Sequence, residues 1–532
     1  MWPSCNRIRE PADGSGSLRR TVFAAVSVRL HLPTNEKATW FPGAALGVGL
    51  LVLTVVYLVL LLRAPSQFGL LLCFGGVALV AAVLGLRSPV LATMYMLAAT
   101  FLRLAIPSGT FPVDPFLPAF AGVVLSTLIW ARVRGGQAPT LGPIEIAMGL
   151  YVVVNLGSML APHRYAAGAP LDPTSFSVSR FVLIGIVMPL AMFLIGRIVF
   201  DHERAVRHLL WCLIAAGAYS AFASITQFHG PTWLIWPRYI LDNPNWEGRA
   251  LGVFNQPVVN GLVLIVGFLA ATLIASHASQ PLAHRILGAS VAVPSVYAIY
   301  LTHTRAVWLS FALVVILGVL GAVGFRTGYV LSLAGVLTTV TINWSGFTSA
   351  DRAAGGVASA GELQDRLNAI ATSVWAIQRE PLTGWGIGRF PAVNTYHHQG
   401  WSPGTPWERG YGVSSHFDML GILVELGIVG LVLWLAVLSL VGGELVRAIR
   451  RLPANGLDNR PFAITAAMSL VALLVTGLTV DLRFFDFPNV VVWLLVGAAI
   501  GRARNVELRA ASHSGASTTQ PPAPSGQVQN EP

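Results

Sequence analysis

Three arginines and one histidine are the side chains of this sequence best suited to chemistry on a phosphorylated ligand. Arg249, Arg305 and Arg366 stand in or beside polar segments between long apolar stretches, and His416 directly precedes another such stretch. The planar guanidinium of arginine pairs bidentately with phosphate oxygens and stays charged at any working pH. Histidine exchanges a proton near neutral pH and can serve as a general base. Long elements must bring these four residues together, because they are far apart along the chain.

Lipid is predicted to be the main solvent of those elements. The chain of 532 residues is 54% hydrophobic and only 11% charged, which is too little charge to cover a water-soluble globule. Residues 47–62 and 311–323 are almost continuously apolar, whereas the strands of a membrane barrel would alternate. A hydrocarbon core of roughly 30 Å needs about 20 apolar helical residues per crossing, so we predict an all-α polytopic membrane protein, a bundle of about 12–14 transmembrane helices with one long helical periplasmic loop.

The candidate spans alternate between two kinds of connecting loop. About 14 spans can be drawn, or about 12 if two of them are re-entrant. They are residues 44–62, 67–85, 89–107, 115–131, 143–161, 180–197, 207–228, 257–276, 286–302, 305–323, 328–346, 417–440, 462–480 and 488–502. Every second loop carries arginine, and the positive-inside rule assigns these loops and both termini to the cytoplasm. The long loops 229–256 and 347–416 then face outward.

Five parts of the chain follow from this pattern. They are a basic cytoplasmic tail (1–43), an N-terminal transmembrane bundle (44–346), a large periplasmic loop with an amphipathic helix (347–416), C-terminal transmembrane helices (417–502) and a disordered cytoplasmic tail (503–532). The amphipathic helix is predicted over 361–379 and is expected to lie near the membrane surface. Its apolar stripe comprises Leu363, Leu367, Ile370, Val374 and Ile377, and we expect this stripe to pack against the protein.

The net charge and the cysteines exclude several other classes. The net charge of +11 comes almost entirely from arginines scattered singly at the ends of apolar runs, which is typical of topology signals and not of nucleic-acid binding. The 3 cysteines form neither a disulfide framework nor a metal motif. His397 and His398 could join His416 in a zinc site, but adjacent histidines rarely chelate one ion together. We therefore predict no metal and no cofactor.

Three segments of the second half of the chain carry a family resemblance. They are Leu301-Thr-His-Thr-Arg-Ala-Val-Trp308, Asp365-Arg366 followed by Glu380-Pro-Leu-Thr-Gly-Trp-Gly-Ile-Gly-Arg-Phe390, and Ser415-His416 followed by Phe-Asp-Met-Leu-Gly-Ile-Leu-Val-Glu-Leu-Gly-Ile-Val-Gly430. In this order they resemble the O-antigen ligase and polymerase superfamily over residues 300–430. A weaker echo is Arg249-Ala-Leu-Gly-Val-Phe-Asn-Gln-Pro-Val-Val-Asn-Gly261, in which Asn260 does not directly follow the proline, as it does in the family pattern.

The resemblance implies a C-type membrane glycosyltransferase whose donor is a glycan on undecaprenyl diphosphate. The acceptor would be a lipid A core sugar in a ligase, another glycan chain in an O-antigen or exopolysaccharide polymerase, or a protein hydroxyl in an O-oligosaccharyltransferase. We expect a multi-pass protein of the bacterial inner membrane whose active site faces the periplasm, and no nucleic-acid partner.

The roles of the family's matching residues carry over to this chain. Arg305 and Arg366, with Arg249 as a weaker candidate, are expected to bind the diphosphate and to neutralise it as it departs. His416 is expected to deprotonate or orient the acceptor hydroxyl. The enzyme would then be a metal-independent inverting glycosyltransferase that contributes to lipopolysaccharide or other cell-envelope polysaccharides.

Other interpretations stay open at this point. An arginine at the end of a span can be a snorkelling anchor, above all Arg249. A transporter or flippase of the same lipid is less favoured, because nearly all charges stand at span ends. An inactive scaffold is also compatible with the sequence. Glu425 lies at membrane depth and is expected to bond to a neighbouring span, the glycines of 384–388 are expected to form a tight turn, and the segment 481–486 has no assigned role.

Overall fold

The computed structural model describes residues 75–76, 79–80, 83–85, 88–105, 114, 116–133, 142–170, 176–243, 246–349, 361–400, 403 and 406–517. Within these residues the regular elements are helices, and no β-strand occurs. Eight helical segments are long and apolar enough to cross a membrane. The prediction of an all-α polytopic membrane protein is therefore confirmed. The predicted tail 1–43 and span 44–62 lie outside the described residues, and span 67–85 is described only in part.

The segments long enough to cross a membrane are α5 (Pro143–Leu160), α6 to α7 (Val178–Val199), α8 (Glu203–His229), α9 (Pro257–Ser276), α10 (Leu282–Leu301), α17 (Asp418–Arg451), α18 (Arg460–Gly477) and the first part of α19 (Asp486–Ser517). Four shorter apolar helices accompany them, namely α3 (Pro89–Phe101), α4 (Phe116–Val133), α11 (Arg305–Gly321) and α12 (Thr327–Ile342). Each of these helices overlaps one of the spans expected from residue 89 onward.

Two helices, α9 and α19, form the core of the bundle because their neighbours cover them on nearly all sides. Close contact between α7 and α19 depends on glycine. A Cβ atom at Gly196 would lie 2.4 Å from the carbonyl oxygen of Leu494, and one at Gly497 would lie 2.0 Å from that of Phe193. Small residues let the two backbones touch, which is how helices gain packing energy in lipid.

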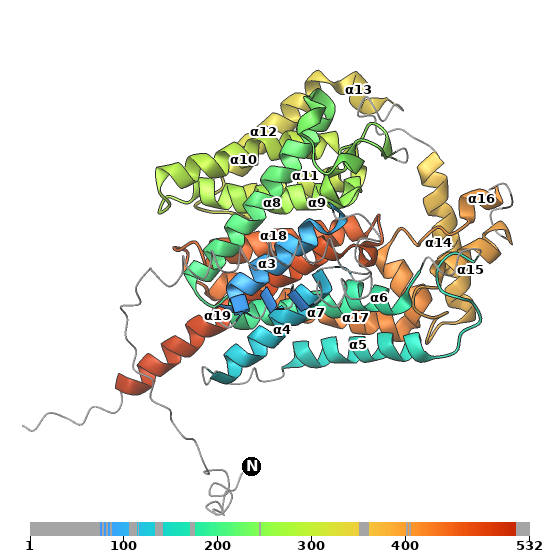
Figure 1. Cartoon of the computed structure of the whole chain (residues 1–532), viewed down its shortest axis with the longest axis horizontal. Coiled ribbons are helices and arrows are strands. Elements are labelled where there is room, and N and C mark those ends of the chain that lie inside the picture. The colour runs from blue at the N-terminus through green and yellow to red at the C-terminus, as the bar shows by residue number, and fades with distance from the viewer. Residues whose placement is uncertain are drawn as a thin grey trace, which may run out of the picture. The chain divides into compact units, whose positions relative to one another are not determined.

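The segment between α12 and α17 is mostly helical and gathers at one end of the long helices (Figure 1). It contains α13 (Trp344–Thr348), α14 (Gly361–Arg379), α15 (Phe390–His397) and α16 (Trp407–Gly410). The helix predicted over residues 361–379 is confirmed as α14. We refer to this end of the molecule as the α14 end.

The buried face of α14 differs from the prediction. Leu367, Ile370 and Val374 of the expected packing stripe are 48%, 36% and 51% exposed. The buried face instead consists of small or polar residues, namely Asn368, Ala369, Thr372, Ser373 and Ala376. These short side chains allow α15 and α17 to approach closely, and the Thr372 hydroxyl donates a hydrogen bond to Asn394 Oδ1 over 2.6 Å. The prediction that the stripe packs inward was therefore wrong.

The tail also requires a correction. A disordered segment was predicted from residue 503, but α19 continues as a helix to Ser517. An ion pair between Arg451 of α17 and Glu507 of α19 links this extension to the neighbouring helix. The half-buried Arg502 pairs with Asp458 over 2.8 Å just before the extension begins.

Candidate functional site

Arg305 is the first residue of α11, and the turn before it is held in an unusual conformation. His303 has a positive φ of 42°, and its side chain is buried, with 6% of its surface exposed. Its Nδ1 atom lies 2.6 Å from the carbonyl oxygen of Gly248, and the Ala250 amide donates to the carbonyl oxygen of Leu301 over 2.9 Å. These two bonds join the turn to the segment that contains Arg249.

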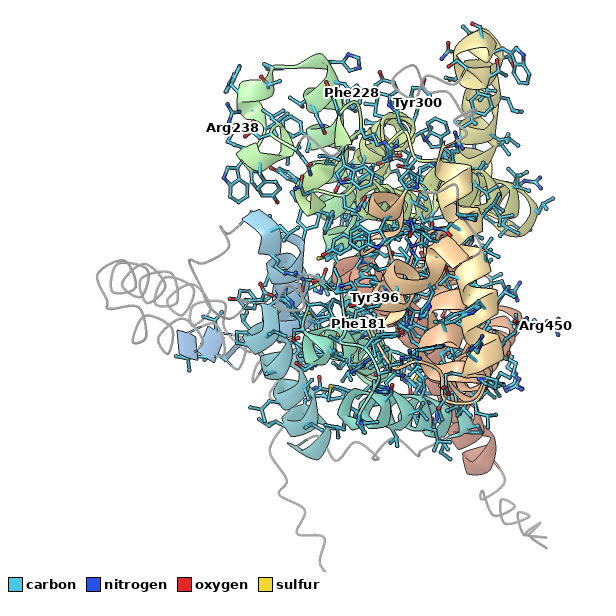
Figure 2. All side chains as sticks on the ribbon, turned by 90° about the vertical axis from the view of Figure 1, so that its right-hand side faces the viewer. Phe181, Phe228, Arg238, Tyr300, Tyr396 and Arg450 are labelled. Carbon is cyan, nitrogen blue, oxygen red and sulfur yellow. The ribbon has the colours of Figure 1, made fainter. Side chains whose placement is uncertain are left out.

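The ring of His303 is enclosed by other aromatic rings. Phe228 and Tyr300 meet it edge-on with ring centroids 5.6 and 5.4 Å away, and both are labelled near the top of Figure 2. Non-glycine residues with positive φ are uncommon and persist where surrounding contacts fix them. The fixed conformation sets the direction in which α11 begins, and therefore the position of Arg305.

Arg249, Arg305 and Arg366 form one electrostatic group, which we call the arginine cluster. Burial lowers the pKa of the Arg249 guanidinium, and the positive charge of Arg305 lowers it further. The same two causes, in the same order, lower the pKa of Arg366 on α14. Like charges raise each other's energy at short range, so three guanidiniums in partly buried positions favour a bound anion. The Arg249 guanidinium also lies over the Trp246 ring, 5.1 Å from its centroid.

His416 lies in the turn before α17 and also has a positive φ, of 56°. The neighbouring Ser415 is fully buried, and its hydroxyl lies 3.1 Å from Asp481 Oδ2 and 2.9 Å from the carbonyl oxygen of Phe417. Both oxygens can accept its proton. The turn that carries His416 is thus attached to the segment 481–486, whose role the sequence left open.

A buried ionic network lies directly behind this turn. Arg483 donates from Nη1 to Glu425 Oε2 over 2.8 Å, and from Nε and Nη2 to the carboxylate of Asp481 over 2.9 and 2.6 Å. The Leu482 amide donates to Asp418 Oδ1 over 2.6 Å. Sequence reasoning assigned no role to Arg483, although its position between two acidic residues was the available signal. Glu425, which was expected to bond to a neighbouring span, instead bonds to Arg483 in the turn after α18 and to the Phe390 amide at the start of α15.

The glycine-rich segment forms a structural turn, as predicted, and inserts into a break in α17. Gly427 has φ 65° and ψ −166°, which interrupts the helix. The Ile428 amide bonds to the Pro381 carbonyl over 2.8 Å, while the Trp385 and Gly386 amides donate to the carbonyls of Val424 and Glu425. The loop therefore pairs with backbone groups that a continuous helix would satisfy internally.

Arg305 and His416 lie at the same end of α18. Ser310 of α11 and Thr476 of α18 share a hydrogen bond of 2.8 Å between their hydroxyls. One residue further along, a Cβ at Gly477 would lie 2.3 Å from Asp418 Oδ2, so α17 begins against the end of α18. Ser310 follows Arg305 by less than two helical turns, and His416 precedes Asp418 by two residues. The starts of α11 and α17 thus flank one helix end.

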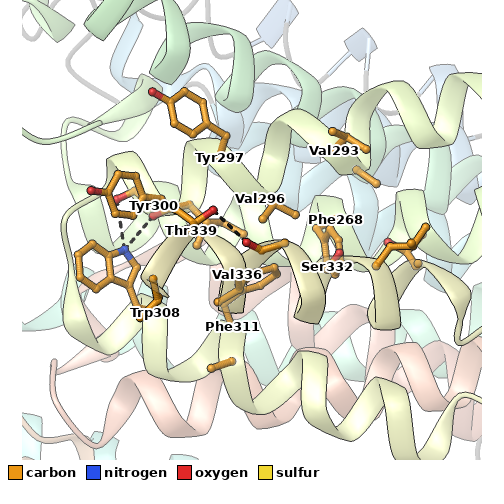
Figure 3. A pocket seen from close by; sticks show the side chains of 18 of the residues that line it. Phe268, Val293, Val296, Tyr297, Tyr300, Trp308, Phe311, Ser332, Val336 and Thr339 are labelled. Carbon is orange, nitrogen blue, oxygen red and sulfur yellow. Dashed lines mark hydrogen bonds between the residues drawn. The ribbon is translucent and has the colours of Figure 1, made fainter. Parts of the chain in front are cut away.

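A mostly apolar cavity of about 870 Å³ extends from Arg305 between α9, α10, α11 and α12 (Figure 3). Its lining reaches from Tyr300 to Arg285 along α10, which is about 22 Å at 1.5 Å per residue. Trp308 forms part of the wall near Arg305, stacked on Tyr300 at 5.6 Å, and its Nε1 donates to backbone carbonyls of α10. The cavity thus has a long, mostly apolar body between Arg305 at one end and Arg285 at the other, and the Nε of Arg285 donates to the Ala275 carbonyl oxygen over 3.1 Å.

The histidines suggested as a zinc site point to different partners. His397 lies 2.8 Å from the Tyr165 hydroxyl, and the buried His398 bonds through Nδ1 to the carbonyl oxygen of Asn394. In the part of the chain that the structure describes, no group of three or more His, Cys, Asp or Glu side chains could hold a metal ion. The two histidines have structural roles in the α14 end.

Comparison with known protein families indicates the class of protein in which this site occurs. Residues 290–435 match the family model described as O-antigen ligase, and this region includes Arg305, Arg366 and His416. The match confirms the resemblance over these residues, and the chain is a multi-pass membrane protein with a region similar to O-antigen ligases. Arg249 and Arg483 lie outside the matched residues. No curated protein matches the chain.

Proposed function

We propose that this protein transfers a glycan from undecaprenyl diphosphate to an acceptor hydroxyl at the periplasmic face of the bacterial inner membrane. The region similar to O-antigen ligases supports glycan transfer in polysaccharide assembly. The observation that carries the finer proposal is that Arg305, whose charge acts on Arg249 and Arg366, lines one end of a mostly apolar cavity. A polyprenyl diphosphate has the same division into an anionic head and a long apolar chain.

The arginine cluster supplies the electrostatic part of the reaction. The acceptor oxygen forms a bond to the anomeric carbon while the bond from that carbon to the diphosphate oxygen breaks. The departing diphosphate carries about two negative charges, and arginines placed before the reaction stabilise that charge without reorganisation. Arg305 and Arg366 bind the diphosphate, and Arg249 supports them from the segment 246–256. A single displacement of this kind inverts the configuration at the anomeric carbon and needs no metal ion.

His416 accepts the proton of the acceptor hydroxyl or orients that hydroxyl for attack. A general base needs a fixed position within hydrogen-bond reach of its proton. The positive φ of His416 and the bond from Ser415 to Asp481 supply that rigidity. Its position beside the end of α18, on the side where α11 begins, supports action on a sugar attached to a diphosphate held by Arg305.

The cavity beside Arg305 holds part of the polyprenyl chain. Because the chain enters from lipid and not from water, the cavity binds it through packing contacts and fixes its direction. Exposed residues of the lining, such as Leu309, Leu331 and Val293, open it toward the lipid. A donor could thus enter sideways from the bilayer.

The test is a transfer assay with purified protein, an undecaprenyl-diphosphate glycan and a set of acceptors. Wild-type protein should form product with EDTA present, whereas His416→Ala should form none although it purifies as a folded protein. Capping of lipid A core would indicate a ligase, chain extension a polymerase, and a glycosylated protein an O-oligosaccharyltransferase. Full activity of His416→Ala would refute its role, and movement of the lipid across vesicles without transfer would indicate a flippase.

A further inference from the structure

A second cleft lies at the opposite end of α14 from Arg366. Its volume is about 590 Å³, and it is lined by the last turns of α5, residues 161–164, the loop 380–385 and α17 beside its break. Arg366 and Arg379 are thirteen residues apart on α14, so the two ends are separated by about 20 Å at 1.5 Å per residue. The proposed reaction uses no residue of this cleft.

Two arginines give the rim of the cleft a positive charge. Arg164 lines the cleft, and Arg379 directly precedes Glu380, which also lines it. The Arg164 guanidinium lies over the Tyr165 ring at 5.3 Å and that of Arg379 over the Trp375 ring at 5.4 Å, and both rings stack on Trp385, which lines the cleft. Glu380 is the one carboxylate among the lining residues. Two guanidiniums against one carboxylate favour an anionic ligand.

Part of the lining of the cleft is apolar. Val154, Leu426 and Val429 belong to it. Leu160 and Leu382, which neighbour lining residues in the sequence, are 79% and 65% exposed. Large apolar side chains at this level of a membrane protein contact lipid rather than water. A ligand in the cleft therefore meets positive charge on one side and hydrocarbon on the other, which fits an amphiphile.

Stacked aromatic rings make one wall of the cleft rigid. Trp385 lines the cleft and stacks on Tyr165 with centroids 5.9 Å apart and on Trp375 at 5.5 Å. Tyr396, labelled in Figure 2, stacks on the other side of Tyr165 at 5.1 Å. Tryptophan and tyrosine are enriched where a membrane meets water, because each ring is apolar with a polar edge. This wall thus indicates the level of the headgroups.

We propose that this cleft binds the phosphorylated headgroup of the lipid-anchored acceptor, with Arg164 and Arg379 on the phosphate and the acyl chains against Val154 and Val429. The identification of the lipid as the acceptor rests on the proposed function, because a transferase that joins two lipid-anchored substrates must hold both at one membrane surface. The distance of about 20 Å along α14 leaves room for an oligosaccharide between the phosphate and the glycosylated hydroxyl. The acceptor is then a glycolipid with several sugars.

Lipid binding can be measured without any transfer reaction, by native mass spectrometry of the purified full chain with phosphatidic acid, phosphatidylcholine or inorganic phosphate. Wild-type protein should bind phosphatidic acid best. The Arg164→Gln/Arg379→Gln variant should bind phosphatidic acid at least about tenfold more weakly, because two charge-assisted hydrogen bonds are lost. The Arg164→Lys/Arg379→Lys variant should keep part of the affinity. Equal affinity of wild type and the glutamine variant, or equal binding of inorganic phosphate, would overturn the cleft assignment.

Two further variants separate this inference from the proposed function. The control variant Arg447→Gln/Arg450→Gln replaces two arginines that lie on α17, outside the cleft, and it should bind phosphatidic acid like wild type. Arg305→Ala should lose transfer but keep this binding. In the transfer assay, Arg164→Gln/Arg379→Gln should raise the KM for a phosphorylated glycolipid acceptor and not the KM for the donor. An unchanged acceptor KM would refute the role of the bound lipid as acceptor.

Discussion

Arg483 Nη1 and Glu425 Oε2 are 2.8 Å apart, with 7% and 1% of the two side chains exposed. The pair joins the segment after α18 to the first third of α17, and Asp481 also accepts from the same guanidinium. Because Asp481 also lies within hydrogen-bond distance of Ser415, the network fixes the turn that carries His416. A change at Arg483 should therefore affect the site without touching a substrate.

Replacement of Arg483 should destabilise the protein more than replacement of Glu425. Arg483→Gln leaves two buried carboxylates without their cation, and breaking a buried pair costs about 3–5 kcal/mol. Glu425→Gln keeps an amide oxygen that can accept from Arg483, so a loss of about 1–2 kcal/mol is expected. Thermal unfolding in detergent, followed by size-exclusion chromatography, gives the order. Equal midpoints for both variants would contradict a network centred on Arg483.

The break in α17 can be tested with a pair of glycines in one helix. Gly427→Ala puts a side chain at φ 65°, where its Cβ would lie 2.2 Å from the Leu382 carbonyl, so a loss of about 1–3 kcal/mol or more is expected. Gly442→Ala is the control, because its Cβ would meet no atom within 4 Å. Alanine there should leave the unfolding midpoint unchanged or raise it, since glycine costs about 1 kcal/mol in a helix. Comparable losses at both sites would argue against a specific break.

At Arg305, a positive charge without the planar guanidinium group should not support the full rate of glycan transfer. Arg305→Lys keeps a positive charge but loses the bidentate fork, so the transfer rate should fall to an intermediate level. Arg305→Ala should reduce the rate by about 100-fold to 1,000-fold, in the range for removal of one donor from a transition-state site. Initial rates with saturating acceptor provide the measurement, with Arg447→Ala as a folded control. Wild-type activity of Arg305→Ala would remove this arginine from the mechanism.

Filling the apolar cavity should weaken binding of long-chain donors selectively. Gly335 lines the cavity, and a Cβ atom added there would meet no atom within 4 Å. The Gly335→Leu variant should therefore fold, and its new side chain should occupy space that the lipid chain needs. The KM for an undecaprenyl donor should rise severalfold, by up to about tenfold, because the leucine side chain removes packing contacts between the cavity and the lipid chain. Donors with short chains should be nearly unaffected. Gly149→Leu on α5 is the control, because Gly149 has equal space and does not line the cavity. An equal change in KM for both donors would place the chain elsewhere.

The sequence by itself determined the class of fold and most of the helices. Long, continuously apolar segments form α-helices in lipid, because each backbone amide must find its hydrogen-bond partner within its own segment. The bounds of α14 could also be predicted, since the heptad-like pattern and Pro381 are local signals. The arginines and His416 were recognised from motifs that a single sequence displays.

Only the tertiary structure decided which faces and which distant residues meet. The apolar stripe of α14 is exposed because its small residues fit closer to α15 and α17, and no local pattern records that competition. The pairing of Arg483 with Glu425 spans 58 positions, and the break at Gly427 exists because the loop 381–386 occupies it. Contacts between segments far apart in sequence depend on the packing of the whole bundle, which local periodicity does not encode.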